Sequence, residues 1–233
     1  MKLEITNLSK SFGEKEVLKN IDFIFESGRI YALIGRNGAG KTTFFNCLNN
    51  DIEVNTGSFK LIDNDIAFNL KSNDIGYVIS TPVVPEFLTA REFLEFFIEI
   101  NKDKVKHDID YYFKLVKINR ADQDKLLKDY SHGMKNKMQI LINIITNPKI
   151  ILLDEPLTSL DIVVQEEMKK LLKSLKSDHI IIFSTHILEL ALDLCDEIVI
   201  INDGHIELVE KDNLNKAKYK KKIIDSLKDV KND

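Results

Sequence analysis

The stretch Gly35-Arg36-Asn37-Gly38-Ala39-Gly40-Lys41-Thr42 decides the fold of this chain. It fits the pattern G-x-x-x-x-G-K-[S/T], follows the apolar run 30–34 and precedes the helix-compatible run 43–48. Glycines in this pattern let the backbone wrap around a polyphosphate and direct its N–H groups inward, and the next helix adds the positive end of its dipole. The stretch therefore predicts a phosphate-binding loop between a strand and a helix.

The side chains of this loop define a candidate nucleotide site. Lys41 is expected to reach the β- and γ-phosphates, and the Thr42 hydroxyl to ligate Mg²⁺. The nucleotide-binding residues assigned here are Gly35, Arg36, Asn37, Gly38, Ala39, Gly40, Lys41, Thr42 and Thr43. The alternative is a glycine-rich turn with a chance lysine. A dinucleotide-binding turn does not fit, because the glycines run G-x-x-G-x-G and not G-x-G-x-x-G.

A second motif is an apolar strand that ends in two carboxylates, Ile150-Ile151-Leu152-Leu153-Asp154-Glu155. Adjacent residues of a strand face opposite ways, so the two acids need different roles. Asp154 is expected to face Mg²⁺, and Glu155 to polarise an attacking water molecule as the catalytic base. The alternative is a pair of solvated acids at a strand end.

The order of elements indicates an α/β protein. Apolar runs at 30–34, 150–153, 180–183 and 198–201 predict buried strands, with helices between them at about 161–176 and 186–195. Alternation at 2–9 and 19–26 predicts two further strands, and helical spacing dominates 89–146. We expect a P-loop NTPase core with a mostly parallel sheet, an N-terminal antiparallel β region and an inserted α-helical subdomain.

Composition narrows the class of protein. The chain has 233 residues, 30% of them charged, and a formal net charge of -4, which disfavours a nucleic-acid binder. Its two cysteines, Cys47 and Cys195, lie far apart and are typical of a reducing compartment. We expect no signal peptide, because Met1 to Glu4 is charged, and no membrane span, because no apolar run approaches about 18 residues.

Motifs between and after these two resemble one family of P-loop NTPases, the ABC (ATP-binding cassette) ATPases. Tyr130-Ser131-His132-Gly133-Met134-Lys135 is similar to the signature of that family, in a variant typical of exporters of drugs, antibiotics and peptides. Pro156-Leu157-Thr158-Ser159-Leu160-Asp161 resembles the D-loop and Phe183-Ser184-Thr185-His186 the H-switch. Leu8-Ser9-Lys10-Ser11-Phe12-Gly13 resembles the segment that carries the A-loop aromatic residue.

The resemblance implies a role for each matching residue. Phe12 would stack on adenine, although alone it suggests a core residue. His186 would hold the γ-phosphate, the water and Glu155, and would join Glu155 and Lys41 as a catalytic residue. Asp161 would organise a dimer contact, although by itself it indicates an ordinary helix N-cap.

The signature implies a site shared between two copies. Ser131 and the Gly133 N–H, with His132 and Met134 completing the motif, would contact the nucleotide held by a second copy. Without the family, Ser131 is simply an N-cap. Ser80 stands where the family usually has the glutamine of the Q-loop, so its reach to Mg²⁺ or to the water is shorter.

As a whole, the resemblance implies an ATP-hydrolysing motor subunit with ATP and Mg²⁺. The expected partners are a second nucleotide-binding domain and a separate transmembrane permease, at the cytoplasmic face of the membrane, with no direct contact to nucleic acid. The expected boundaries are 1–210 for one nucleotide-binding domain, with a helical subdomain at about 85–147, and 211–233 for a charged helical tail. An exporter of hydrophobic compounds or peptides is favoured.

Two other functions stay open. A non-transport ABC ATPase could act on nucleic acid or on the ribosome, although the interval from Lys41 to Ser131 leaves no room for the long coiled coil of chromosome-type members. The other is a regulator that binds ATP without turnover, which the presence of Glu155 and His186 disfavours.

Overall fold

A six-stranded sheet forms the centre of the molecule. The computed structural model describes residues 1–158, 160–210 and 215–228. The strand order of the sheet is β10-β9-β3-β8-β7-β6, and five strands are parallel, with only β10 antiparallel to its neighbour. Its strands are β3 (Ile30–Ile34), β6 (Ile75–Val78), β7 (Ile150–Asp154), β8 (Ile180–Thr185), β9 (Glu197–Asn202) and β10 (His205–Val209). The mostly parallel core is therefore confirmed.

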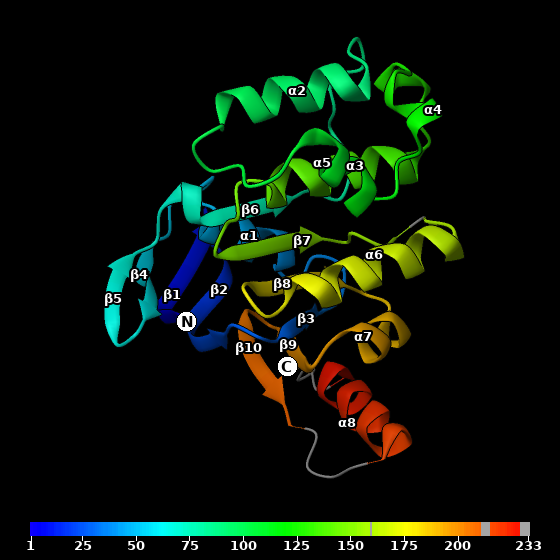
Figure 1. Ribbon diagram of the computed structural model, residues 1–233. Coiled ribbons are helices and arrows are strands. Elements are labelled where there is room, and N and C mark those ends of the chain that lie inside the picture. The colour runs from blue at the N-terminus through cyan, green and yellow to red at the C-terminus, as the bar shows by residue number, and fades with distance from the viewer. Residues whose placement is uncertain (159, 211–214, 229–233) are drawn as a thin grey trace.

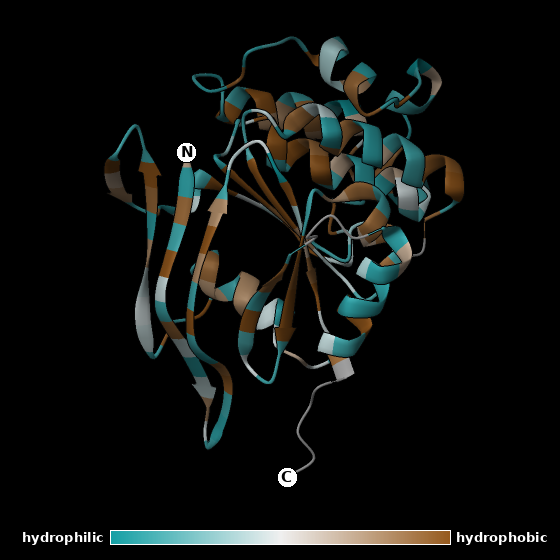
Figure 2. Ribbon diagram, turned by 90° about the horizontal axis from the view of Figure 1, so that it is seen from below, coloured by the Kyte–Doolittle hydropathy of each residue, from teal (hydrophilic) through white to brown (hydrophobic). Residues whose placement is uncertain are grey.

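The central strands are buried on both faces, which explains their continuous apolar sequence. Alternate residues face opposite ways, so one face carries Tyr31 and Leu33 and packs against α1 (Lys41–Leu48) and a second sheet. The other face carries Ala32 and Ile34 and packs against helices. These are α5 (His132–Ile144), α6 (Ile162–Leu175), α7 (Leu188–Leu194) and α8 (Lys216–Lys228). Figure 2 shows the hydrophobic central strands between the two layers.

The second sheet is antiparallel and lies beside the core, as expected for the N-terminal region (Figure 1). Its order is β2-β1-β4-β5, with β1 (Lys2–Phe12), β2 (Lys15–Glu26), β4 (Thr56–Asp63) and β5 (Ile66–Asn69). The first two strands are longer than predicted. Asn7 and Asn20 have positive φ angles (50° and 44°) and the register shifts near them, which interrupts the alternation of apolar and polar residues on which the prediction rested.

A group of helices lies between β6 and β7 in the chain and gathers at one end of the molecule (Figure 1). It comprises α2 (Ala90–Ile100), α3 (Ile109–Leu115), α4 (Arg120–Gln123) and α5, with the short 3₁₀ turn η2 (Leu127–Asp129); another such turn, η1 (Ser72–Asp74), precedes β6. Thr89 begins α2 with a capping box, in which its hydroxyl accepts from the Glu92 N–H and the Glu92 carboxylate accepts from the Thr89 N–H. Leu94, Phe113 and Met138 join these helices to the core.

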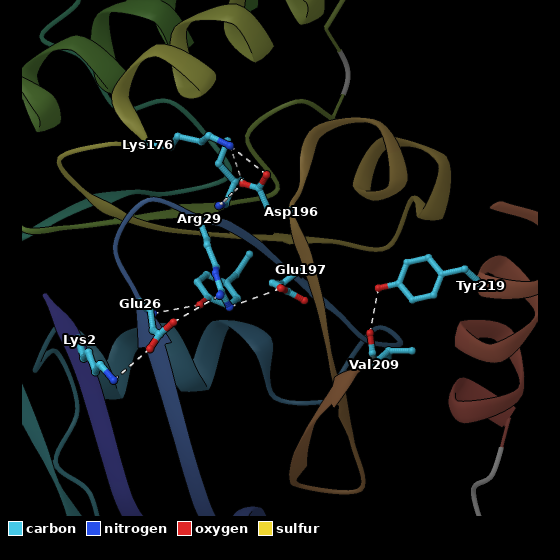
Figure 3. Close-up of polar contacts among 10 residues, drawn as sticks. Lys2, Glu26, Arg29, Lys176, Asp196, Glu197, Val209 and Tyr219 are labelled. Atoms are coloured by element: carbon cyan, nitrogen blue, oxygen red, sulfur yellow. Dashed lines mark hydrogen bonds and ion pairs between the residues drawn. The ribbon is translucent and has the colours of Figure 1, made fainter. Parts of the chain in front are cut away.

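Polar contacts tie the outer parts of the molecule to the core sheet (Figure 3). Arg29 lies between Glu26 of β2 (3.6 Å) and Glu197 of β9 (3.5 Å), so it links the two sheets. In α8 the Tyr219 hydroxyl donates to the Val209 carbonyl at 3.0 Å, and Ile223 is fully buried. Of the predicted tail, 211–214 and 229–233 lie outside the described residues. Over the described ranges no helix has the length and apolar character needed to cross a membrane.

Candidate functional site

The predicted site residues meet at the carboxyl edge of the core sheet. Strands β3, β8, β7 and β6 are neighbours in that order, and all four are parallel. The segments that follow them therefore emerge side by side. These segments carry the phosphate loop, His186, the Asp154–Glu155 pair and Ser80.

The phosphate loop begins where β3 ends, and it folds around the Lys41 side chain. Gly38 and Gly40 have φ angles of 80° and 105°, values that residues with a Cβ rarely adopt. Gly40 precedes the first turn of α1, and the buried Lys41 ammonium donates to the carbonyls of Gly35 (2.9 Å) and Arg36 (3.3 Å). These two bonds hold a positive charge at the centre of the loop.

Thr42 and Asp154 form the oxygen-rich part of the site. The Thr42 hydroxyl donates to Asp154 Oδ2 at 2.9 Å, across 112 residues of sequence. The Asp154 side chain is buried at the end of β7. A hydroxyl and a carboxylate are hard oxygen ligands of the kind that Mg²⁺ prefers, so these two residues fit the metal predicted for this position.

Glu155 leaves the strand in a left-handed conformation, with a φ angle of 51°. Such a conformation costs about 1–2 kcal/mol for a residue with a Cβ, so the surrounding contacts must offset it. Glu155 Oε1 lies 2.9 Å from His186 Nδ1, and Oε2 accepts from the Thr158 hydroxyl at 3.0 Å. The predicted pair of Glu155 and His186 is therefore in direct contact, and Thr158 is a third member, which the sequence analysis placed in the D-loop segment without assigning it a role.

A cavity of about 430 Å³ lies over these residues. Phe12, 51% exposed, lines it, as does Ser80, so the structure brings both residues to the same cavity as the phosphate loop. The lining residues are Phe12, Lys15, Val17, Asn37, Gly38, Gly40, Lys41, Thr42, Thr43, Ser80, Asp154 and Glu155. Phe12 and Val17 give one part of the cavity an aromatic and apolar lining, which suits a nucleotide base. The phosphate loop lines another part, which suits a polyphosphate.

The signature residues do not line this cavity. Ser131 is the N-cap of α5, and its hydroxyl accepts from the Met134 N–H at 3.2 Å. His132 is exposed, and Gly133 lies so close to α6 that a Cβ there would meet the Val164 side chain at 3.3 Å. Asp161 caps α6 by accepting from the Val164 N–H at 3.0 Å. Ser131 and Asp161 therefore have the helix-capping contacts of ordinary N-caps within this chain.

The sequence analysis assigned no role to several residues that line or support the site. Lys15 and Val17 come from β2, which reaches the cavity only through the packing of the two sheets. Ser184 is register-paired with Asp154 on the neighbouring strand. Burial raises the pKa of Tyr77 on β6, and the nearby Asp154 carboxylate adds to the shift. The sequence signal that could have found Ser184 is its place in the H-switch segment, two residues before His186.

The fold and the site together define a P-loop nucleoside triphosphatase. A family model described as ABC transporter matches residues 18–158, more than half of the chain. The chain therefore belongs to the ABC transporter family, as an ATP-binding subunit. It is an ATPase, with ATP as its nucleotide and Mg²⁺ as the metal.

Relatives with established and with unestablished functions align over most of the chain. An uncharacterized ABC transporter ATP-binding protein of Methanocaldococcus jannaschii is 34% identical over 87% of this chain and 75% of its own. The bacitracin transport ATP-binding protein BcrA of Enterococcus faecalis is 30% identical, covering 91% and 70%. The phosphonates import ATP-binding protein PhnC of Fusobacterium nucleatum is 31% identical, covering 90% and 92%. A solved ATP-binding subunit of an ABC transporter has a TM-score of 0.74 at 25% identity, covering 88% of both chains.

Proposed function

We propose that two copies of this nucleotide-binding domain close head-to-tail around two ATP molecules and so drive a separate membrane permease. The observation that carries the proposal is the separation of the signature from the cavity. Ser131 and His132 are exposed at the start of α5, and neither lines the cavity of its own chain. The N-terminus of α5 and the Ser131 hydroxyl suit an anion, so they would complete the cavity of a second copy.

Within each site we assign the reaction to Glu155, His186 and Lys41. Lys41 already lies at the centre of the phosphate loop, where its charge would stabilise negative charge on the γ-phosphate. Glu155 would orient the attacking water and accept its proton, while His186 and Thr158 hold the carboxylate from two sides. Mg²⁺, bound near Thr42 and Asp154, would neutralise phosphate charge.

The surface that would receive the permease is an apolar groove beside the helical group, which we take as the subdomain inserted at about 85–147. Its cavity measures about 650 Å³ and is lined by Val83, Val84, Pro85, Phe87, Leu88, Phe93 and Phe96. Phe87 is 79% exposed and Phe96 61% exposed. Large aromatic side chains exposed beside an apolar groove are typical of binding hot spots. The groove would place the motor at the cytoplasmic face of the membrane.

Replacing Phe87 by aspartate should separate the motor from the permease while sparing its chemistry. A charge in an apolar contact is expected to lower the amount of chain that sediments with membranes of its own cells by about tenfold or more. The ATPase rate of the isolated chain should stay within about twofold, because Phe87 does not line the nucleotide cavity. Ile66→Asp, at an exposed apolar residue of β5, is the matched control and should sediment normally. Normal membrane sedimentation of F87D would refute the groove as the docking surface.

The direction of transport that we propose is export, of hydrophobic compounds or peptides. It is supported by the Tyr-Ser-x-Gly-Met-Lys form of the signature at 130–135. Relatives at similar identity are named for bacitracin transport and for phosphonate import, so the relatives do not choose between the directions.

Deleting the gene that encodes this chain distinguishes an exporter from an importer. Loss of an exporter should make the cells more sensitive to one or more peptide or hydrophobic antibiotics, by roughly fourfold or more in inhibitory concentration, because the compound is no longer pumped out. The parental gene should restore resistance, and the Glu155→Gln gene should not. A growth requirement for a small nutrient, with unchanged drug sensitivity, would show an importer.

A further inference from the structure

Ser184 of β8 contacts both acids at the end of the neighbouring strand β7, Asp154 and Glu155. It lies beyond residues 18–158, the segment that the family model matches. Its side chain is fully buried. The hydroxyl donates to Asp154 Oδ1 at 2.5 Å and accepts from the Glu155 N–H at 3.0 Å. One hydroxyl therefore satisfies a carboxylate oxygen and a backbone donor that belong to two consecutive residues.

The strand register explains why the hydroxyl reaches both groups. In the parallel ladder of β7 and β8, Asp154 is paired with Ser184. In a continued ladder, the Glu155 N–H would bond to a β8 carbonyl; here it bonds to the Ser184 side chain. The chain can therefore leave the strand at Glu155, whose φ angle of 51° turns its carboxylate toward His186 and Thr158.

The same hydroxyl also fixes the carboxylate of Asp154. Oδ2 accepts from Thr42 of helix α1 and Oδ1 accepts from Ser184 of strand β8, so the two oxygens are held by two different elements. A buried carboxylate with both oxygens bonded cannot rotate freely, and hydrogen bonds to a charged group are stronger than neutral ones. Ser184 is thus one side chain that contributes to the orientation of both Asp154 and Glu155.

We propose that Ser184 is a positioning residue for ATP hydrolysis, which sets the Asp154 carboxylate toward the metal and the Glu155 carboxylate toward the attacking water. It touches neither nucleotide nor metal in this account and acts through the two acids. Its removal should therefore impair turnover and the use of metal more than it impairs nucleotide binding.

Two substitutions distinguish positioning from packing. Ser184→Ala removes the hydroxyl and leaves a small void, whereas Ser184→Cys fills the space with a weak hydrogen-bonding group. Both should lower kcat by about 10- to 100-fold, with the KM for ATP within about threefold. Ser174→Ala is the matched control, since that α6 hydroxyl donates to the Leu171 carbonyl and does not line the nucleotide cavity, so kcat should stay within twofold.

A binding measurement tests the metal part without turnover. In the Glu155→Gln background, a fluorescent ATP analogue is bound while Mg²⁺ is titrated. Adding Ser184→Ala should raise the Mg²⁺ concentration for half-maximal enhancement by about threefold or more and leave metal-free binding unchanged. Thermal unfolding without ligand shows whether each variant is folded at the assay temperature. Parental kcat and metal requirement in S184A, or restoration of both by S184C, would overturn the proposal.

Discussion

Glu155→Gln should lower the rate of ATP hydrolysis by about 10²- to 10⁴-fold, the usual effect of losing a general base. The amide keeps the size of the side chain but cannot accept a proton from water. Nucleotide binding should stay within about threefold, because the loop around Lys41 makes the phosphate contacts that we assign. Steady-state phosphate release and equilibrium binding of a fluorescent ATP analogue measure the two quantities.

The control for this substitution is Glu166→Gln. Glu166 is an exposed residue of α6 that bonds to Lys169, so the same chemical change there should leave the rate within about twofold. If Glu155→Gln hydrolyses ATP at the parental rate, Glu155 is not the group that activates water. The contact with His186 would then be only structural.

Lys41→Ala should impair both binding and hydrolysis, in contrast to Glu155→Gln. The substitution removes a buried positive charge from the centre of the phosphate loop and leaves the Gly35 and Arg36 carbonyls without that donor. Losing one preorganised electrostatic contact typically costs about 10²- to 10³-fold in rate. Titration with the ATP analogue should show weaker binding as well, because the same charge would contact the bound phosphates.

Lys149→Ala is the matched control for the loss of a lysine. Lys149 pairs with Asp74 at 3.4 Å and does not line the cavity, so kcat and affinity should both stay near parental values. Circular dichroism checks that the loop substitution has not unfolded the domain. Parental affinity for ATP in K41A would contradict the placement of the phosphates in this loop.

The parts of the fold that could be predicted are those with uniform burial. Strands β3, β7, β8 and β9 have apolar runs because both of their faces are covered, and the prediction located each of them. Strand β5 is exposed throughout, so its sequence, Ile-Ala-Phe-Asn, has no alternation to detect. The length of β1 was underestimated for a different reason, the register shifts between Leu8 and Ser11, which interrupt the alternation of apolar and polar residues there.

The candidate site also contains residues that the sequence located and residues that needed the structure. Contiguous motifs located the phosphate loop, Asp154, Glu155 and His186, because each motif is a short segment with its own chemistry. Ser184 and Thr158 lie inside the H-switch and D-loop segments, but their contacts depend on strand register and on the turn after Glu155, so the motifs alone assigned them no role. Phe12 needed the structure to decide between a core position and the cavity, and it lines the cavity.

We propose that the ATP site of one copy is completed by the signature residues of a second copy. The residues at the start of α5 do not line the nucleotide cavity of their own chain, so under this proposal a second copy would complete the site. Trapping the ATP-bound state tests the association of two copies, because Glu155→Gln should bind ATP without hydrolysing it.

Size-exclusion chromatography with light scattering on Glu155→Gln, with and without Mg²⁺ and ATP, measures the mass of the assembly. We expect one chain without nucleotide and two chains with it. We expect a return to one chain when Ser131→Glu places a negative charge at the N-cap that would face the phosphates bound by a second copy. A single chain at every protein concentration in saturating Mg²⁺-ATP would contradict the shared site.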